Sequence, residues 1–486
     1  MKNIYYTLLC CTCLFTFSCC NKNIHPSDEP TVPTDRYDTL LILSTNDVHA
    51  HIDNMAKEKA YIDRMKKEYS KVLVISAGDI FTGSPVVDQY PERGYPIVDL
   101  MNRLGYKIMA IGNHDFDYGQ TVLNERLIQA NFPALCANAD FSQTILSDKI
   151  KPYKIISVNG LKVALVGFVQ RSSGNGIPAT APGNVANIIF SDALTNYSKY
   201  NSLRDSGEVF VVVSHLGIDA DRILAQRFSA PDVIIGGHSH TRLEPAETIN
   251  GVLVTQAGGN LSYIGKTILY LKNGVVERKI NVLVPTATLT VEDTDIKTEI
   301  VKYNDNPSLK RVIGRATANF SGKEALGNLM TDAVTDQFNL DMAFTNNGGI
   351  RISYISQGNI TLSKIYELDP FGNDVVVFDL SLSEVETLLK YTCRSGFINL
   401  QISGAKYVYN KTTKKVTLTD YNNQPLSATK TYKVGMNSYV AETEMINALP
   451  TAIGTYMYTT TAGTLVNYIE QEQEVTPQAP RATIVQ

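Results

Sequence analysis

Most of the histidines in this chain lie directly after short apolar runs, in the company of acidic or amide residues. The sequence has 486 residues and only 7 histidines, five of which follow such runs (His49, His114, His215, His238 and His240). Asp47, Asp79 and Asn113 occupy matching places after three of the runs. One histidine after a strand is usually structural, but five in one pattern indicate a shared site.

These residue types fit a pair of divalent cations. Imidazole nitrogens suit zinc, whereas carboxylate and amide oxygens suit harder ions such as manganese or magnesium. A carboxylate between two cations can bridge them, so one aspartate can serve both. Glycines stand beside Asp79, Asn113 and His238, where they permit sharp turns and leave room for a substrate. The residues alone predict a hydrolase with two divalent metal ions, drawn from Zn, Mn, Co or Mg.

The apolar runs alternate with amphipathic stretches, which is typical of a layered α/β domain. The runs are rich in β-branched residues and favour strands buried on both faces (Leu40–Ser44, Val72–Ser76, Ile108–Ile111, Val163–Val169, Val209–Val213 and Val233–Ile235). Between the first two runs, Met55–Tyr69 has apolar residues spaced for one helical face. Since ligands bind at strand ends in α/β sheets, the polar residues are expected to converge at one sheet edge.

A second domain follows the first. We expect the first domain at residues 38–284, a linker at 285–310 and the second domain at 311–470. The second domain is expected to contain one helix and several strands (Lys323–Phe338; Val375–Leu380, Tyr407–Tyr409 and Thr431–Val434). The tail at 471–486 is rich in Gln, Glu and Pro, a composition that predicts a loosely ordered segment.

The N-terminus has the form of an export signal. Lys2 precedes an apolar run from Ile4 to Phe17, which is too short to span a membrane as a helix. Ser18-Cys19 at its end resembles the cleavage site of a bacterial lipoprotein, with residues 1–19 as signal peptide and Cys19 as the lipidated residue. Cys20 is a second candidate, and a plain signal peptide with a freely secreted product is the alternative.

Residues 20–37 would then be a flexible tether. We expect a protein of the periplasm or cell surface, whose only membrane contact is the N-terminal lipid. A net charge of -4 and a pI near 6.0 leave no basic excess for a polyanion, so nucleic acid is not expected as a partner. The body holds only two cysteines, which allow at most one disulfide. The sequence does not indicate an oligomeric state.

The strand-end segments resemble those of the calcineurin-like metallophosphoesterases, and most closely the 5'-nucleotidase branch. They read Asn-Asp-Val-His-Ala-His, Ala-Gly-Asp, Gly-Asn-His-Asp-Phe-Asp, Ser-His-Leu-Gly and Gly-Gly-His-Ser-His. Later segments match the second domain of that branch: the run from Glu324 to Ala333, Asn346-Asn-Gly-Gly-Ile-Arg351 and Pro370-Phe-Gly-Asn373. The resemblance implies a four-layer αββα metallophosphoesterase domain followed by a smaller mixed α/β substrate-binding domain.

The resemblance also implies residue roles. Asp47, His49 and His240 would hold one metal, Asn113, His215 and His238 the other, and Asp79 would bridge. Water activated by the metals would be the nucleophile, because bound cations lower its pKa toward neutrality. His114, oriented by Asp117, would stabilise the transition state and assist the leaving oxygen. Arg351 would bind the phosphate, and His51 would lie just outside the metal ligands.

The match is weaker where the nucleotide base would bind. That branch clamps the base between two aromatic side chains, and stacking suits the task because every base has a π-face. Phe397 is the only aromatic residue in the first of the two regions here. In the second, Glu442-Thr-Glu-Met-Ile replaces a Gly-Gly-Asp-Gly-aromatic segment, and Tyr456 or Tyr458 could fill the gap.

The predicted function is therefore hydrolysis of nucleoside monophosphates outside the cytoplasm. Close alternatives are a 2',3'-cyclic-nucleotide phosphodiesterase, a nucleotide-sugar pyrophosphatase or a hydrolase of sulfur esters. A lipoprotein that binds nucleotides without turnover is an alternative of another class. A pure binder would not need His114 and Asp117, which favours an enzyme.

Overall fold

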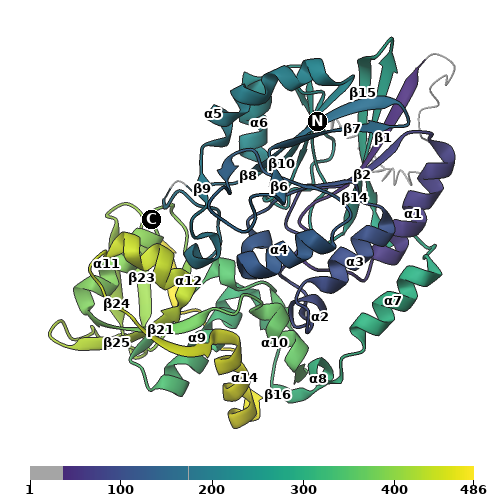
Figure 1. Cartoon of the computed structure of the whole chain (residues 1–486). Coiled ribbons are helices and arrows are strands. Elements are labelled where there is room, and N and C mark those ends of the chain that lie inside the picture. Colours follow the sequence, from purple (N-terminus) through teal and green to yellow (C-terminus); the bar gives the residue numbers. More distant parts are fainter. Residues whose placement is uncertain (1–36, 173) are drawn as a thin grey trace, which may run out of the picture.

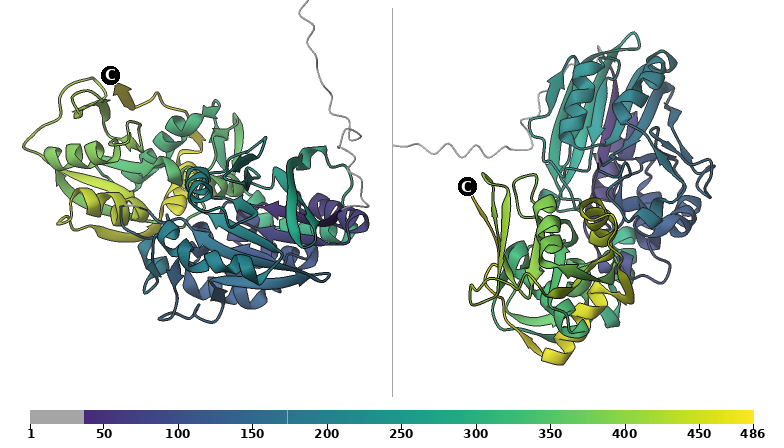
Figure 2. Two further views of the ribbon diagram at one scale, coloured as in Figure 1. Left: turned by 90° about the horizontal axis from the view of Figure 1, so that it is seen from above. Right: turned by 90° about the vertical axis from the view of Figure 1, so that its left-hand side faces the viewer.

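The computed structural model describes residues 37–172 and 174–486. These residues form two bodies, and the chain passes from one to the other along one side of the molecule (Figures 1 and 2). The predicted signal peptide, Cys19, Cys20 and the tether up to residue 36 lie outside the described residues.

The first domain is built on two sheets. One has seven strands in the order β15-β14-β1-β2-β3-β4-β6. Its strands are β1 Asp38–Thr45, β2 Val72–Ser76, β3 Ile108–Ala110, β4 Ala134–Leu135, β6 Ile150–Lys151, β14 Tyr263–Lys272 and β15 Val275–Pro285. The run from β1 to β6 is parallel, and β14 and β15 add antiparallel strands beside β1.

The other sheet has six strands in the order β12-β13-β11-β10-β8-β7. Its strands are β7 Tyr153–Val158, β8 Leu161–Val169, β10 Val209–His215, β11 Val233–Gly236, β12 Glu247–Ile249 and β13 Val252–Gln256. The four inner strands are parallel, and β7 and β12 close the edges in antiparallel pairing. Strand β10 is buried along its whole length, as its unbroken apolar run predicts.

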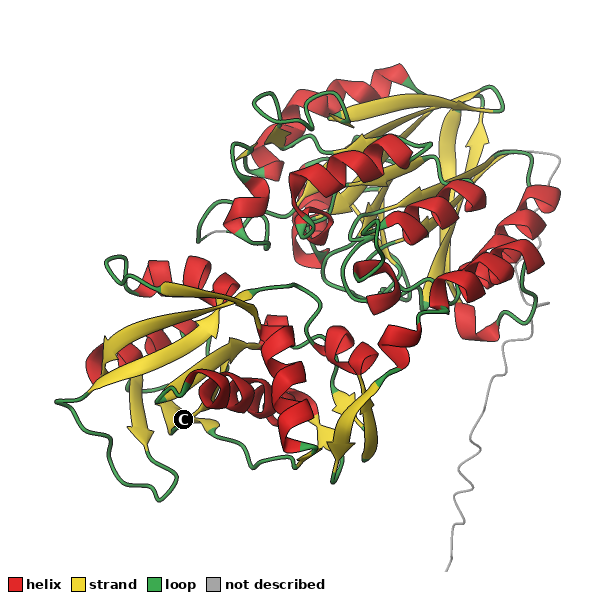
Figure 3. Ribbon diagram, turned by 60° about the horizontal axis from the view of Figure 1, so that its bottom comes forward, coloured by secondary structure: helices red, strands yellow, loops and turns green. Residues whose placement is uncertain are grey.

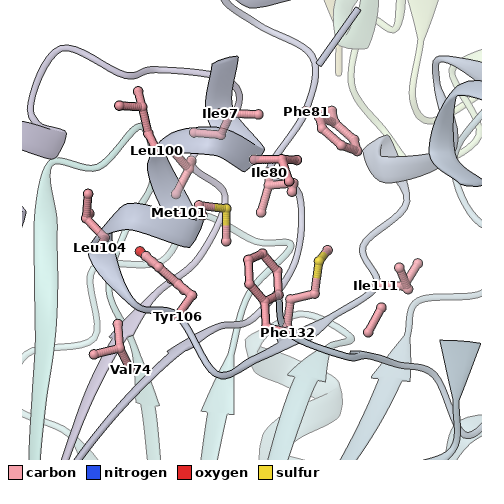
Figure 4. Packing of buried hydrophobic residues seen from close by; sticks show 14 of the residues in the cluster. Val74, Ile80, Phe81, Ile97, Leu100, Met101, Leu104, Tyr106, Ile111 and Phe132 are labelled. Atoms are coloured by element: carbon pink, nitrogen blue, oxygen red, sulfur yellow. The ribbon is translucent and has the colours of Figure 1, made fainter. Parts of the chain in front are cut away.

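Leucine, isoleucine and valine side chains from both sheets form one buried cluster between them. Helices α1 (Met55–Glu68), α3 (Tyr95–Leu104) and α4 (Gly119–Gln129) cover the outer face of the seven-stranded sheet. There Met101 of α3 packs in one buried cluster with Tyr106 and Phe132 (Figure 4). Helices α5 (Ala193–Tyr197) and α6 (Ile218–Arg227) cover the other sheet. The four-layer αββα arrangement is confirmed (Figure 3).

The segment between the domains is more structured than a plain linker. Helix α7 (Thr294–Asn304) begins where the Asp293 side chain accepts hydrogen bonds from the backbone N–H groups of Asp295 and Ile296. Ile296 and Ile300 then join the core of the first domain. The short helix α8 (Pro307–Lys310) leads into the second domain.

The second domain has a five-stranded sheet in the order β22-β18-β25-β21-β26, with two three-stranded sheets beside it. Its strands include β16 Val312–Ala316, β18 Met342–Asn346, β20 Gly358–Thr361, β21 Asp374–Ser381, β22 Leu400–Ser403, β23 Lys406–Asn410, β24 Lys415–Thr419, β25 Thr431–Asn437 and β26 Thr455–Thr460, and β17 Phe320–Ser321 pairs with β19 Tyr354–Ile355 in a two-stranded sheet. Its main helices are α9 Gly322–Phe338, α10 Leu362–Leu368, α11 Leu382–Thr392 and α14 Thr461–Glu472, and a π-helical turn spans Ala441–Met445.

The expectation of a loosely ordered tail is wrong. Strand β27 (Glu474–Val475) pairs with β16, and β28 (Ala482–Val485) pairs in parallel with β23. Arg481 anchors the tail through a guanidinium nitrogen 2.9 Å from the Asp332 carboxylate. The polar composition of residues 471–480 obscured the short β-branched run that follows it.

In the described part of the chain, no helix combines the length and apolar character needed to cross a bilayer. Cys136 and Cys393, the two cysteines of the described residues, are both buried and free, so no disulfide joins them.

Candidate active site

The predicted metal ligands meet where the two sheets of the first domain adjoin. Three of the strands that carry them (β1, β2 and β3) belong to the seven-stranded sheet, and two (β10 and β11) belong to the six-stranded sheet. The polar residues were expected to converge at the edge of one sheet, but the strands that carry them belong to two sheets.

The first cluster consists of Asp47, His49 and His240, whose ligand atoms all lie within 4.8 Å of one another. The Nε2 atoms of His49 and His240 are 3.0 Å apart. His49 directs its other ring nitrogen, Nδ1, at the Thr82 carbonyl oxygen, 2.9 Å away. If that nitrogen donates to the carbonyl, Nε2 keeps its lone pair for a cation.

The second cluster consists of Asp79, His215 and His238, again with ligand atoms within 4.8 Å of one another. Asn113 joins it, because its side-chain oxygen lies 2.9 Å from Nδ1 of His238. Nδ1 of His215 is held 2.7 Å from the Ala77 carbonyl, so its buried Nε2 is directed at the Asp79 carboxylate, 3.0 Å away. A buried nitrogen of this kind fits a metal ligand.

Asp79 lies between the two clusters. Its Oδ2 atom is 3.0 Å from Nε2 of His215 and 3.9 Å from Nε2 of His49. Its Oδ1 atom accepts a hydrogen bond of 2.8 Å from the backbone N–H of His114. One oxygen therefore faces both sets of ligands while the other fixes the neighbouring loop.

The charges of the clusters fit cations. Burial lowers the pKa of His238 to about 3 and that of His240 to about 4, so both imidazoles are neutral and able to bind metal. Burial also lowers the pKa of His215, but the carboxylates of Asp79 and Asp47 outweigh it and raise that pKa to about 10. Without a metal, a proton thus takes the place that the donor set offers to a cation.

The backbone at the ligands is strained. Five of the ligand residues have left-handed φ angles of 48° to 74° (Asp47, His49, Asp79, His238 and His240). Such conformations are uncommon outside glycine and gather at functional sites. Gly112 has no room for a side chain, because a Cβ atom there would lie 2.2 Å from Oδ1 of Asp79.

Asp115 supports this geometry from the neighbouring loop. Its carboxylate accepts backbone hydrogen bonds from Asp79 (3.1 Å), Ile80 (2.9 Å) and Gly112 (2.7 Å), and so ties the loop after β2 to the loop after β3.

His114 and Asp117 form a pair beside the clusters. Nδ1 of His114 lies 2.6 Å from Oδ2 of Asp117, whose other oxygen accepts a hydrogen bond of 2.8 Å from Thr180. Burial lowers the pKa of His114, but the charges of Asp117 and Asp79 outweigh it and raise the pKa above its usual value. The fixed Nδ1 leaves Nε2 to meet a substrate.

A cavity opens over both clusters, and we call it the main cavity. The first domain contributes Asp79, Asn113, His114, Asp117, Ala179, Thr180, Ala181, Asn184, His238 and His240, and the second contributes Asn346, Gly348, Gly349, Arg351, Phe371, Asn373 and Tyr439. Its walls therefore come from both domains, with the metal ligands on one side and the second domain on the other.

Arg351 and Phe371 bring the second domain against the clusters. The Arg351 guanidinium lies 3.3 Å from Nε2 of His49, and no carboxylate of the described residues pairs with it. The Phe371 ring stacks on His114 with 5.6 Å between ring centroids, and the Arg351 guanidinium carbon lies 5.6 Å from the centroid of the same ring.

The predicted base-binding aromatics are not in the main cavity. Phe397 is 58% exposed and does not line it, and neither Tyr456 nor Tyr458 does. Phe371 and Tyr439 are the aromatic side chains, other than histidines, that line it. Phe371 stands in the motif Pro370-Phe-Gly-Asn373, and Tyr439 stands shortly before Glu442-Thr-Glu-Met-Ile, but the sequence alone does not show which way their side chains point.

Comparison with known proteins agrees with this geometry. The family model of calcineurin-like phosphoesterases matches residues 40–242, and that of the 5'-nucleotidase C-terminal domain matches residues 306–448. The trifunctional nucleotide phosphoesterase protein YfkN of Bacillus subtilis is 28% identical over 484 residues, which cover 85% of this chain but only 32% of that protein. This chain thus spans about a third of the length of YfkN.

Two further proteins match along most of their length. The 5'-nucleotidase of Diplobatis ommata is 26% identical over 480 residues, covering 83% of this chain and 82% of that protein. The crystal structure of a 5'-nucleotidase precursor from Thermus thermophilus has a TM-score of 0.80 and 28% identity, covering 92% of this chain and 99% of the other.

The fold and the two histidine–carboxylate clusters place the chain among the calcineurin-like metallophosphoesterases, which are phosphoric ester hydrolases that use divalent metals. With its matching C-terminal domain, the chain belongs to the 5'-nucleotidase family.

Proposed function

We propose that this enzyme is an extracytoplasmic 5'-nucleotidase with two metal ions, which releases phosphate from nucleoside monophosphates. The observation that carries the proposal is the main cavity itself. It brings the two clusters of predicted metal ligands and the His114–Asp117 pair together with a wall from the second domain. That wall offers Arg351 and aromatic side chains.

The side chains around the main cavity have separate roles in the reaction. When bound, divalent cations supply positive charge for the phosphoryl oxygens and lower the pKa of water toward neutrality. Arg351, which has no carboxylate partner among the described residues, binds a phosphoryl oxygen. His114 holds a proton on Nε2 and transfers it to the leaving oxygen, while Asp117 fixes the ring and stabilises its charged form.

The organic group of the substrate occupies the outer part of the main cavity. Phe371 is stacked on His114 and lies near the reacting phosphate, whereas Tyr439 lines the cavity farther along the second domain. We assign Tyr439 as the residue that contacts the nucleoside, in the role that was predicted for Phe397.

A panel assay tests the proposal. Purified protein loaded with manganese, cobalt or zinc is given nucleoside 5'-monophosphates, 2',3'-cyclic nucleotides, nucleotide sugars and a sulfur ester, and the released product is measured. Phosphate release from the monophosphates is expected. Turnover of cyclic nucleotides or nucleotide sugars alone would make the enzyme a phosphodiesterase or pyrophosphatase, and binding without turnover would make it a nucleotide-binding lipoprotein.

Export with lipidation at Cys19 is part of the proposal and rests on the N-terminal sequence. Cys19→Ser is expected to abolish incorporation of labelled fatty acid and to move the protein from the membrane to the soluble fraction. Retained labelling that is lost only in Cys20→Ser would assign the anchor to Cys20.

A further inference from the structure

A second cavity, which we call the rear cavity, adjoins the clusters of predicted metal ligands. Arg351 lies between it and the main cavity. His49 and His240 of the first cluster line it from the first domain, and Lys323, Arg351 and Glu367 line it from the second. Arg351 and His240 line both cavities, so the two meet at the first cluster. Neither His114 nor Asp117 lines the rear cavity, which therefore lies away from the acid–base pair.

Positive charge is in excess in the rear cavity. Within residues 37–172 and 174–486, neither Lys323 nor Arg351 has a carboxylate at ion-pair distance. The single carboxylate among the lining residues, that of Glu367, is already paired with Lys364. An anion in this cavity would meet two cations that lack a counter-charge.

The two cations are held close enough to repel each other. Nζ of Lys323 donates a hydrogen bond of 2.6 Å to the Asn347 carbonyl, which fixes the ammonium at the start of α9. Burial and the positive charge of Arg351 both lower the pKa of Lys323. An anion placed between the two side chains would relieve this repulsion and favour the charged form of Lys323.

We propose that the rear cavity binds a phosphate group, with Lys323 and Arg351 as its cationic ligands. The proposal rests on the function proposed above. In that reaction the organic group would leave through the main cavity beside His114, whereas the phosphate would remain beside His49 and His240 of the first cluster, where the rear cavity opens. The phosphate group can be released inorganic phosphate or the terminal phosphate of a substrate that carries two.

Lys323→Gln tests the assignment, with Lys310→Gln as a matched control. Lys310 is an exposed lysine paired with Asp305, so its substitution makes the same change in charge elsewhere. Inhibition of the metal-loaded enzyme by inorganic phosphate is measured with a monophosphate substrate. A lost charged hydrogen bond should raise the inhibition constant roughly tenfold in Lys323→Gln and less than about twofold in Lys310→Gln.

A second measurement does not depend on turnover. Inorganic phosphate should raise the Tm of the wild type and of Lys310→Gln, and it should raise the Tm of Lys323→Gln less at the same concentration. If nucleoside monophosphates are not substrates, the proposed function fails, but this measurement and inhibition assays with a small aryl phosphate still report on the rear cavity.

The source of the phosphate group follows from a third comparison. If KM for a nucleoside diphosphate rises in Lys323→Gln much more than KM for the monophosphate, the cavity holds the terminal phosphate of the substrate. If only product inhibition weakens, it holds released phosphate. Inhibition, Tm response and both KM values indistinguishable from those of Lys310→Gln would overturn the proposal.

Discussion

The two sides of the main cavity are built in different ways. On the metal side, the ligands follow buried strands, and most of them are almost completely buried: Asp47 and His215 are 0% exposed. On the second-domain side, Phe371 follows the end of helix α10, and Tyr439 stands in a short helical turn after β25. The metal side is built on buried strands and serves one reaction. The other side consists of loops and turns, the parts of a fold that most often determine which substrate is bound.

This difference separates chemistry from recognition. Changes on the metal side should act on every phosphate ester alike, because the phosphoryl group is common to all of them. Changes on the second-domain side should distinguish one organic group from another. The following predictions, from the largest effect to the smallest, test whether the division holds.

Removal of metal should abolish activity toward all substrates. The Asp47 and Asp79 carboxylates are buried beside each other, and without cations they lose most of their compensating charge. A chelator should therefore also lower the Tm, and manganese, cobalt or zinc should restore both properties. Full activity in protein shown by elemental analysis to be metal-free would contradict the assigned mechanism.

His114→Ala should lower kcat by roughly 10²- to 10⁴-fold, the scale of lost acid–base assistance. Metal content should remain near that of the wild type, because the His114 ring is hydrogen-bonded to Asp117 and is not one of the predicted metal ligands. Asp117→Asn, which keeps the shape of the pair but not its charge, should have a smaller effect of the same kind. Loss of both metals in His114→Ala would show that this residue is a ligand.

The sequence predicts the metal side of the main cavity better than the second-domain side. The gathering of the polar residues could be predicted from the sequence pattern, because each of them follows a buried strand, whereas the αββα layers and the division into two clusters were implied by the resemblance to the metallophosphoesterases. Asp47 and His240 lie far apart in the sequence, yet each is tied to the end of a strand. The inward positions of Phe371 and Tyr439 could not be predicted, because they depend on how two domains pack against each other. The tail was not recognised for a related reason, since β28 pairs with β23, a strand far from it in the sequence.

Arg351→Ala should lower kcat/KM for nucleotides and for a small aryl phosphate by similar factors, roughly 10- to 100-fold, the cost of a charged hydrogen bond to the phosphate. Arg278→Ala, which removes an exposed arginine of β15, is the matched control and should change neither. Although Arg351 belongs to the second domain, its guanidinium lies against His49, a predicted metal ligand. A loss confined to nucleotides would move Arg351 to the recognition side of the comparison.

Tyr439→Ala should have the smallest but most selective effect. Tyr439 lines the main cavity, whereas Phe397 is 58% exposed outside it, so the two residues form a direct test of where the organic group binds. Loss of one base–aromatic contact costs about 1–3 kcal/mol, so KM for a nucleoside monophosphate should rise roughly fivefold or more in Tyr439→Ala. KM for a small aryl phosphate should change less, and Phe397→Ala should leave both substrates nearly unaffected. Tyr439→Phe separates the ring from the hydroxyl group: if it behaves like the wild type, the ring makes the contact, and if it behaves like Tyr439→Ala, a hydrogen bond does. A selective rise in KM for nucleotides in Phe397→Ala, with none in Tyr439→Ala, would instead place the nucleoside at the surface near Phe397 and contradict the arrangement described here.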